Sequence, residues 1–174
     1  AITISSTMNN PFDTLEFFHE QADIYRIIHN NQKALEILEK GLIEARHLED
    51  KQLVSKYLNN LGIIYGDSDY TKAIGFFKES YMLRKEMNDK LALSVLFSNV
   101  SALRYKHKHF DKAIKYASLS LNISSEIEDK LGLCLNHNNL GEMYLAQDDL
   151  DKALAHFERG LKHSREMSWK EGIV

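Results

Sequence analysis

Three asparagines recur at nearly equal steps and could bind a peptide backbone. Asn60, Asn99 and Asn139 are 39 and 40 residues apart. A side-chain amide has one acceptor and two donors, so it can pair with both the C=O and the N–H of an extended chain. Each such pair contributes about 1 kcal/mol net, so a row of three would fix the register of a ligand with modest affinity. These amides are the main candidate binding groups of the sequence.

The other reactive side chains form no recognisable catalytic or metal-binding motif. His107 and His109 lie in a segment typical of a turn, with no third ligand at a useful spacing. Cys134 has no histidine or aspartate partner, so an inert, half-buried thiol is expected. His156 and His163 are seven residues apart and are expected on the outer surface of a helix. We therefore expect no catalytic residues, no metal site and no cofactor.

The composition indicates a globular protein without a strong charge bias. The chain has 174 residues, of which 44% are hydrophobic and 27% charged, and its formal net charge is −3. Charges of both signs alternate along the chain, which argues against a nucleic-acid or anionic-membrane partner. A single cysteine excludes an intrachain disulfide and fits a reducing cytoplasm. No apolar run reaches the roughly 18 residues of a membrane span.

Apolar residues follow the helical period in eight segments, which pair into four helix hairpins. We call the two members of each hairpin its first and second helix. The predicted pairs are about 11–28 with 32–48, 51–66 with 70–87, 90–106 with 110–127, and 130–146 with 150–167. Asp50, Asp89 and Asp129 precede first helices and are expected to cap them. Residues 1–10 show no period and are expected to be disordered or vector-derived.

The hairpins repeat with a period of about forty residues. Small residues of the second helices recur at Ala34, Ala73, Ala113 and Ala153, and the pattern Leu140-Gly141-x-x-Tyr144 of one first helix repeats at Leu61-Gly62-x-x-Tyr65. The predicted units are about 11–50, 51–89, 90–129 and 130–169, with a partial fifth unit at 170–174 that begins a new helix at Lys170. Such self-similarity is typical of a solenoid.

This pattern of Leu-Gly-x-x-Tyr followed by Ala-x-x-x-Phe resembles the tetratricopeptide repeat family. The period is longer than the 34 residues typical of that family and resembles the form in LGN/Pins-type adaptors, kinesin light chains and bacterial regulators. HEAT and armadillo repeats share the period but lack this pattern. The resemblance implies an all-α, right-handed superhelical solenoid of four antiparallel hairpins plus the start of a fifth, whose first helices line a concave groove.

The expected ligand-binding positions lie on the groove side of the first helices. Asn60 is about 150° from the packing face of its helix, which predicts an exposed position. The expected set is Asn60, Asn99, Asn139, Asn59, Asn138, Lys56, Glu142 and Glu20, with Val95 and Leu135 as apolar neighbours. In long-period relatives an Asn before the Leu-Gly step contacts bound peptide, which favours the groove. The alternative, in which the asparagines bond only between neighbouring helices, stays open.

The resemblance implies a non-catalytic scaffold that binds a protein or an extended peptide. Glu16, Glu20 and Asp23 make the first unit acidic, so we expect a basic ligand segment there. The alternative function is a sensory or regulatory segment of a larger bacterial signalling protein. Self-association through the C-terminal end is also expected, because the face from Leu150 to Leu161 would be partly uncovered.

Overall fold

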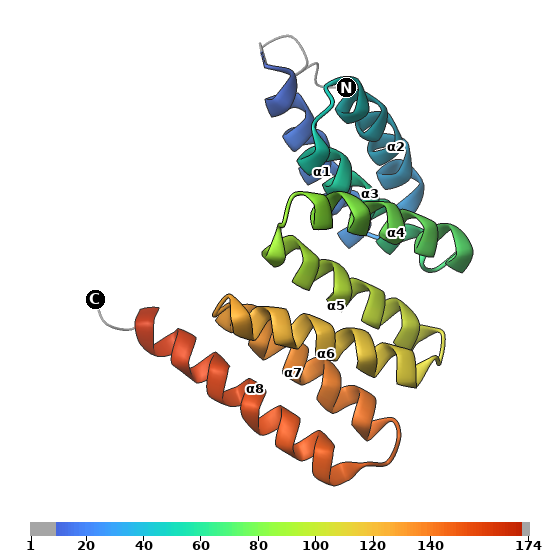
Figure 1. The fold of residues 1–174 in the computed structure, drawn as a ribbon. Coiled ribbons are helices and arrows are strands. Elements are labelled where there is room, and N and C mark those ends of the chain that lie inside the picture. The colour runs from blue at the N-terminus through green and yellow to red at the C-terminus, as the bar shows by residue number, and fades with distance from the viewer. Residues whose placement is uncertain (1–9, 172–174) are drawn as a thin grey trace. The chain divides into compact units, whose positions relative to one another are not determined.

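The computed structural model describes residues 10–171, which form eight α-helices and no β-strand (Figure 1). The helices are α1 (Pro11–Ile27), α2 (Asn31–His47), α3 (Lys51–Tyr65), α4 (Tyr70–Glu86), α5 (Lys90–Lys106), α6 (Phe110–Glu126), α7 (Lys130–Leu145) and α8 (Leu150–Glu171). The predicted all-α hairpin architecture of a solenoid is confirmed. The predictions for residues 1–9 and 172–174 lie outside the described residues.

Aspartates begin the first helices, as the sequence predicts. Asp50 accepts a hydrogen bond from the N–H of Leu53 over 2.9 Å, and Asp89 and Asp129 make the same bond three residues ahead over 3.0 Å each. The first amide groups of a helix have no intrahelical partner, so each cap contributes about 1 kcal/mol. Local sequence thus sets where α3, α5 and α7 start.

Six turns between helices are closed by a residue in the left-handed region that is not glycine. These residues are His29, Glu49, Asn88, Lys108, Glu128 and Asp148, with φ between 53° and 62°. In the first of these turns the N–H of Asn30 reaches back to the oxygen of Tyr25, a bond across five residues that is typical of a Schellman motif. The left-handed residue reverses the chain and lets the next helix begin within three residues.

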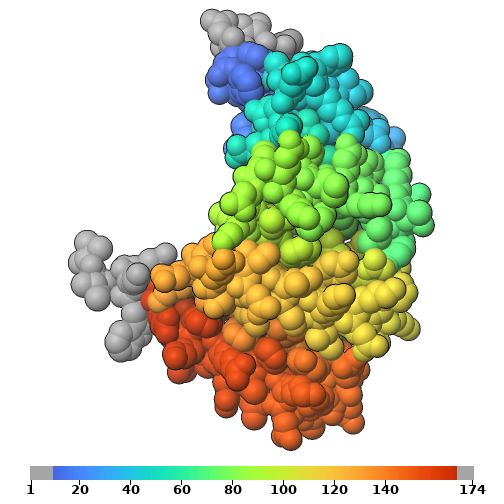
Figure 2. Space-filling view, in the orientation of Figure 1, coloured from blue at the N-terminus to red at the C-terminus, as the bar shows by residue number. Residues whose placement is uncertain are grey.

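The molecule divides into two compact units, residues 1–84 and 85–174. Unit 1 contains α1 to α3 and most of α4, and unit 2 contains α5 to α8. Within unit 1, α2 contacts both α1 and α3, and within unit 2 the contacts join α5 to α6, α6 to α7 and α7 to α8. In Figure 2, segments of neighbouring colour accordingly lie side by side within each unit. The core of unit 1 is formed by leucines such as Leu38, Leu58 and Leu61, and that of unit 2 by smaller residues around Leu140.

Buried serines hold the first and second helices of two hairpins close together. In unit 1, the Ser80 hydroxyl of α4 donates to the backbone oxygen of Ser55 in α3 over 2.8 Å. In unit 2, the Ser120 hydroxyl of α6 donates to the oxygen of Ser94 in α5 over 2.7 Å. A serine is small enough for close helix approach, and each hydroxyl is satisfied in the interior. The same repeat position therefore makes the same bond in both units.

The last helix runs further than the sequence predicts. The predicted end near residue 167 and the predicted new helix at Lys170 are wrong, since α8 continues without a break through Glu171. The segment 168–170 contains no glycine, proline or aspartate, so no residue there favours ending a helix.

Candidate ligand-binding surfaces

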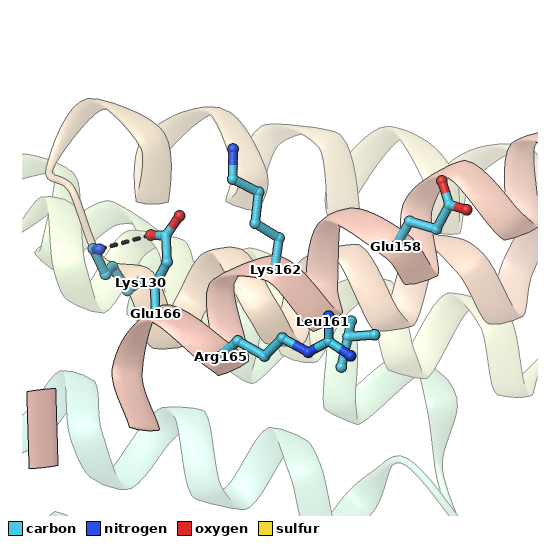
Figure 3. A pocket seen from close by; sticks show the side chains of 6 residues that line it. All are labelled: Lys130, Glu158, Leu161, Lys162, Arg165 and Glu166. Atoms are coloured by element: carbon cyan, nitrogen blue, oxygen red, sulfur yellow. Dashed lines mark hydrogen bonds and ion pairs between the residues drawn. The ribbon is translucent and has the colours of Figure 1, made fainter. Parts of the chain in front are cut away.

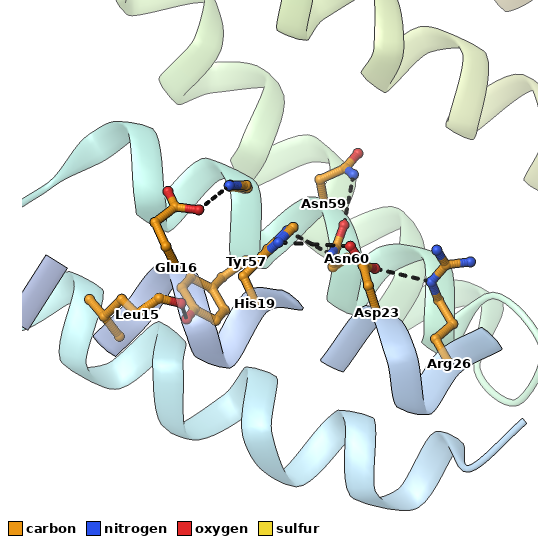
Figure 4. Close-up of polar contacts among 9 residues, drawn as sticks. Leu15, Glu16, His19, Asp23, Arg26, Tyr57, Asn59 and Asn60 are labelled. Carbon is orange, nitrogen blue, oxygen red and sulfur yellow. Dashed lines mark hydrogen bonds and ion pairs between the residues drawn. The ribbon is translucent and has the colours of Figure 1, made fainter. Parts of the chain in front are cut away.

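Asn60 lies buried between two helices instead of on an open groove. Its side chain is 7% exposed, and its Nδ2 lies 2.9 Å from His19 Nε2 and 3.3 Å from Asp23 Oδ1, both on α1 (Figure 4). The prediction of an exposed position is wrong, because an angle measured around one helix takes no account of the neighbouring first helix. Asn60 links α3 to α1.

The neighbours of Asn60 complete a small polar network. Asn59, which is also buried, donates from Nδ2 to Asn60 Oδ1 over 3.3 Å, so its predicted groove position is wrong as well. Burial and the positive charge of Lys56 lower the pKa of His19, and this outweighs the opposite effect of Asp23. A neutral His19 accepts from Asn60 at Nε2 and carries its proton on Nδ1.

Two ion pairs of unit 1 lie beside this polar network. Lys56 Nζ lies 2.5 Å from Glu16 Oε2 and joins α3 to α1, and Arg26 pairs with Asp23 over 3.3 Å. Glu20 is exposed. Two of the three carboxylates expected to make this end acidic are thus neutralised by cations, which leaves Glu20 as the main negative charge. The surface attracts a basic segment less strongly than the sequence suggests.

Asn139 in unit 2 repeats the geometry of Asn60 with a smaller partner. It is half-buried, and its Nδ2 donates to Ser98 Oγ on α5 over 3.3 Å. Ser98 lies 41 residues before Asn139, the same separation as between His19 and Asn60. Bonding between neighbouring helices, the alternative reading of the asparagines, therefore describes both contacts. Asn99 is half-buried.

Asn138 and Glu142 are exposed on α7. Asn138 borders the partner helix of its own hairpin, because its Oδ1 lies 2.5 Å from where a Cβ on Gly160 would stand. Glu142 lies one turn beyond the predicted asparagine position and keeps its carboxylate in solvent. Both exposed residues remain predicted ligand contacts.

Four large apolar side chains form an exposed column on α5 and α7, which contact each other. We call this column the apolar face; its members are Leu91, Val95, Leu131 and Leu135, which are 54%, 46%, 57% and 52% exposed. The sequence indicated Val95 and Leu135 but missed Leu91 and Leu131, which lie one helical turn earlier on the same side. By repeat spacing, Val95 and Leu135 correspond to Glu16 and Lys56 in unit 1. The two units therefore present different chemistry at equivalent positions.

Three histidines meet between α7 and α8, where none was expected. His137 Nδ1 lies 2.9 Å from His156 Nδ1, and the rings of His137 and His163 stack with centroids 5.9 Å apart. The predicted outer-surface position of His156 and His163 is wrong, since both are half-buried. Burial and, next, the nearby His156, His163 and Arg159 lower the pKa of His137 to about 4. His137 is therefore neutral near pH 7, and its ring packs against those of His156 and His163.

The described residues contain no group of three or more histidine, cysteine or acidic side chains arranged to hold a metal ion. Within the same part of the chain, no helix is both long enough and apolar enough to cross a bilayer.

Comparison with known proteins agrees with this architecture. Residues 92–166 match the family model described as tetratricopeptide repeat. A comparison with curated proteins gives no match. BtubC (BKLC) from P. vanneervenii is similar in structure, with a TM-score of 0.77 and 22% identity over 93% of this chain and 67% of that one.

Two further solved structures are similar to this chain over about half of their own length. A Rap protein complexed with competence and sporulation factor has a TM-score of 0.85 and 16% identity over 91% of this chain and 45% of that one. Aspartyl phosphate phosphatase F from Bacillus subtilis has a TM-score of 0.67 and 17% identity over 92% of this chain and 51% of that one. At these identities the likeness shows the fold. Residues 92–166 thus match the tetratricopeptide repeat family, and the repeated helix hairpins give the chain the fold of such a repeat protein.

Proposed function

We propose that this protein is a non-catalytic scaffold that recognises a protein segment or extended peptide on the first-helix surface of unit 2. The observation that carries the proposal is the apolar face, whose four side chains are about half exposed on two adjoining helices. Exposed apolar side chains gathered in one place favour an interaction site over a solvated surface. A cytoplasmic location and the absence of a nucleic-acid or membrane partner belong to the same proposal.

Asparagines beside the apolar face supply polar contacts for a peptide backbone. Asn139 uses one N–H of its amide on Ser98, and among the described residues its carbonyl oxygen has no partner. An amide held at one end by a neighbouring helix is already ordered, so a ligand loses less side-chain entropy when it binds. Apolar pockets then select the ligand's side chains while the amide fixes its register.

The ligand that this surface fits has apolar side chains and few charges at its centre. Glu142 lies at one edge of the surface, and the four central side chains carry no charge. Buried charges without partners are costly, so an acidic or basic centre would bind poorly. We therefore expect ligands with two or more large apolar residues, and a basic residue near Glu142.

A selection from a random peptide library on the immobilised chain tests the proposal. We expect enriched peptides rich in Leu, Ile, Phe or Met, whose affinity falls at least about tenfold in the double variant Val95→Gln/Leu135→Gln, since each lost apolar contact removes about 1.5 kcal/mol. The matched control is Leu119→Gln, an exposed leucine on the second helix α6. No enrichment, or equal affinity for both variants, would overturn the proposal.

A second candidate function is regulation within a larger protein. It is favoured by the similar structures of a Rap protein with competence and sporulation factor and of a phosphatase, of which this chain spans 45% and 51%. A regulatory segment must change state when its ligand binds, whereas a scaffold need not. Hydrogen exchange with a selected peptide distinguishes them: slowed exchange confined to α5–α8 indicates a scaffold, and altered exchange in α1–α4 indicates a regulator.

A further inference from the structure

The helix α8 exposes a row of leucines on one side. Leu150, Leu154 and Leu161 are 59%, 60% and 50% exposed, and they lie four and seven residues apart, so they share one side of the helix. We call these three leucines the α8 face. A pocket of about 740 Å³ adjoins Leu161; it is lined by Lys130, Glu158, Leu161, Lys162, Arg165 and Glu166 (Figure 3).

The repeat itself shows what covers this kind of face. In unit 1 the counterpart of Leu161 is Leu42 on α2, which is 6% exposed and lies in the core with residues of α3. In unit 2 the counterpart is Leu121 on α6, which packs against core residues of α7. In both cases a first helix covers the second helix before it. The α8 face has the shape and chemistry to receive a first helix.

The helix α1 is a first helix whose matching side is open. Ile24 is 59% exposed, while its counterparts Ile64 on α3 and Met143 on α7 are 5% and 3% exposed. Ile27 and Ile28 add further exposed apolar area at the same end of the helix. We call Ile24, Ile27 and Ile28 the α1 face. The two faces are the two halves of a contact that occurs inside each unit.

We propose that the α8 face of one molecule binds the α1 face of a second copy, in the way that α2 receives α3. The internal contact includes a hydrogen bond of 2.8 Å from the Tyr65 hydroxyl to Glu39 Oε1. By repeat spacing Glu39 corresponds to Glu158 and Tyr65 to Tyr25. Among the described residues, the Tyr25 hydroxyl and the Glu158 carboxylate have no hydrogen-bond partner, so they are free to form this bond between copies.

Charge complementarity selects α1 as the occupant. Lys130 pairs with Glu166 over 2.7 Å, so Lys162 and Arg165 outnumber Glu158 beside the α8 face. The helix α1, by contrast, exposes the carboxylates of Asp13 and Glu20. In the antiparallel register set by Gly41 against Tyr57 in unit 1, Arg165 falls near Asp13 of the second copy. Opposite charges around an apolar centre fix both partner and register.

The contact joins two different surfaces, so each bound copy leaves one face of each kind free. Such a head-to-tail interface builds open-ended oligomers unless the rotation closes a ring. The apolar face on α5 and α7 takes no part in it. Peptide binding uses the apolar face and association uses the α8 and α1 faces, so one can be lost while the other is kept. The double variant Val95→Gln/Leu135→Gln should therefore still associate.

Complementation between two blocked variants tests the proposal by sedimentation velocity. Ile24→Asp blocks the α1 face and Leu161→Asp blocks the α8 face; both side chains are at least half exposed, and circular dichroism checks folding. We expect the unmodified chain to grow in mass with concentration beyond a dimer, each variant alone to be monomeric, and their 1:1 mixture to form a heterodimer. A monomeric unmodified chain, or self-association of Ile24→Asp through α8 alone, would overturn the proposal.

A conservative pair separates association from folding. Tyr25→Phe removes the hydroxyl proposed to reach Glu158 and should weaken association about fivefold, the effect of one hydrogen bond of about 1 kcal/mol. Its unfolding midpoint should not change. Tyr65→Phe removes the internal counterpart and should lower the unfolding midpoint while association stays the same. Equal association of Tyr25→Phe and the unmodified chain would contradict the assigned register.

Discussion

The Tyr57 hydroxyl of α3 donates a hydrogen bond of 2.6 Å to the backbone oxygen of Leu15 on α1 (Figure 4). It reaches α1 past Gly41 on α2, where a Cβ would stand 2.6 Å from the hydroxyl oxygen. Tyr57 is completely buried, and this burial raises the pKa of its hydroxyl, so the donor keeps its proton. The Tyr57 side chain of α3 thus bonds to α1 and packs against α2. The absence of a side chain on Gly41 leaves room for the Tyr57 ring.

Gly41→Ala should destabilise the protein by about 1–3 kcal/mol, because the new methyl group meets the Tyr57 ring and the core must shift. Gly75 on α4 is the matched control, since a Cβ there has nothing within 4 Å. Gly75→Ala should stabilise the protein by about 0.5–1 kcal/mol through backbone entropy. Urea unfolding of both variants checks this. If Gly41→Ala were as stable as the unmodified chain, the Tyr57 ring would not be tightly packed against Gly41.

Asn60→Ala should lower the free energy of unfolding by about 1–2 kcal/mol, because His19 and Asp23 lose a buried partner. Asn122, an exposed residue on α6, is the control. Asn122→Ala should be neutral or stabilising by about 0.6 kcal/mol, since alanine favours helix. Chemical denaturation measures both. Equal effects at the two sites would contradict a structural role for Asn60.

Acid should destabilise unit 2 through His137. Its pKa is about 4 in the folded protein against 6.5 in the unfolded chain, so between these pH values the unfolded chain binds more protons. The free energy of unfolding therefore rises with pH over this window, by about 3 kcal/mol in total at 1.36 kcal/mol per pH unit. Urea titrations from pH 4 to 7 should show this slope.

The slope should flatten in His137→Gln, which cannot titrate, and persist in His47→Gln, because His47 is exposed at the end of α2. If His137→Gln retained the full pH dependence, another group would be responsible.

The ion pair between Lys56 and Glu16 should contribute little to stability. Its side chains are 38% and 50% exposed, and such pairs are worth about 0–1 kcal/mol because solvent and salt screen them. Glu16→Gln should shift the urea midpoint only slightly at low salt and not at all in 0.5 M NaCl. A large loss of stability at both salt concentrations would mean that the pair anchors α1.

Most of the fold could be predicted because its determinants are local. Helix limits agree with the prediction within one residue or two before α8, and Asp50, Asp89 and Asp129 cap the helices that they precede. The period of the apolar residues and the capping groups act within one turn of helix, so the sequence alone carries them.

The candidate site was predicted less well because exposure depends on the neighbouring helix. Asn60 is buried only because α1 lies beside α3, and His156 and His163 are covered only because His137 stands opposite them. The position of a side chain around its own helix holds no information on these partners. Val95 and Leu135 could be predicted because their side of the helix stays open.

The six left-handed residues of the turns, from His29 to Asp148, have a consequence for the stability of the protein. Each costs about 1 kcal/mol compared with glycine in the same conformation. These corners belong neither to the apolar face nor to the α8 and α1 faces. Substitution of these turn residues by glycine should therefore raise the stability of the protein while leaving every residue of the three faces in place.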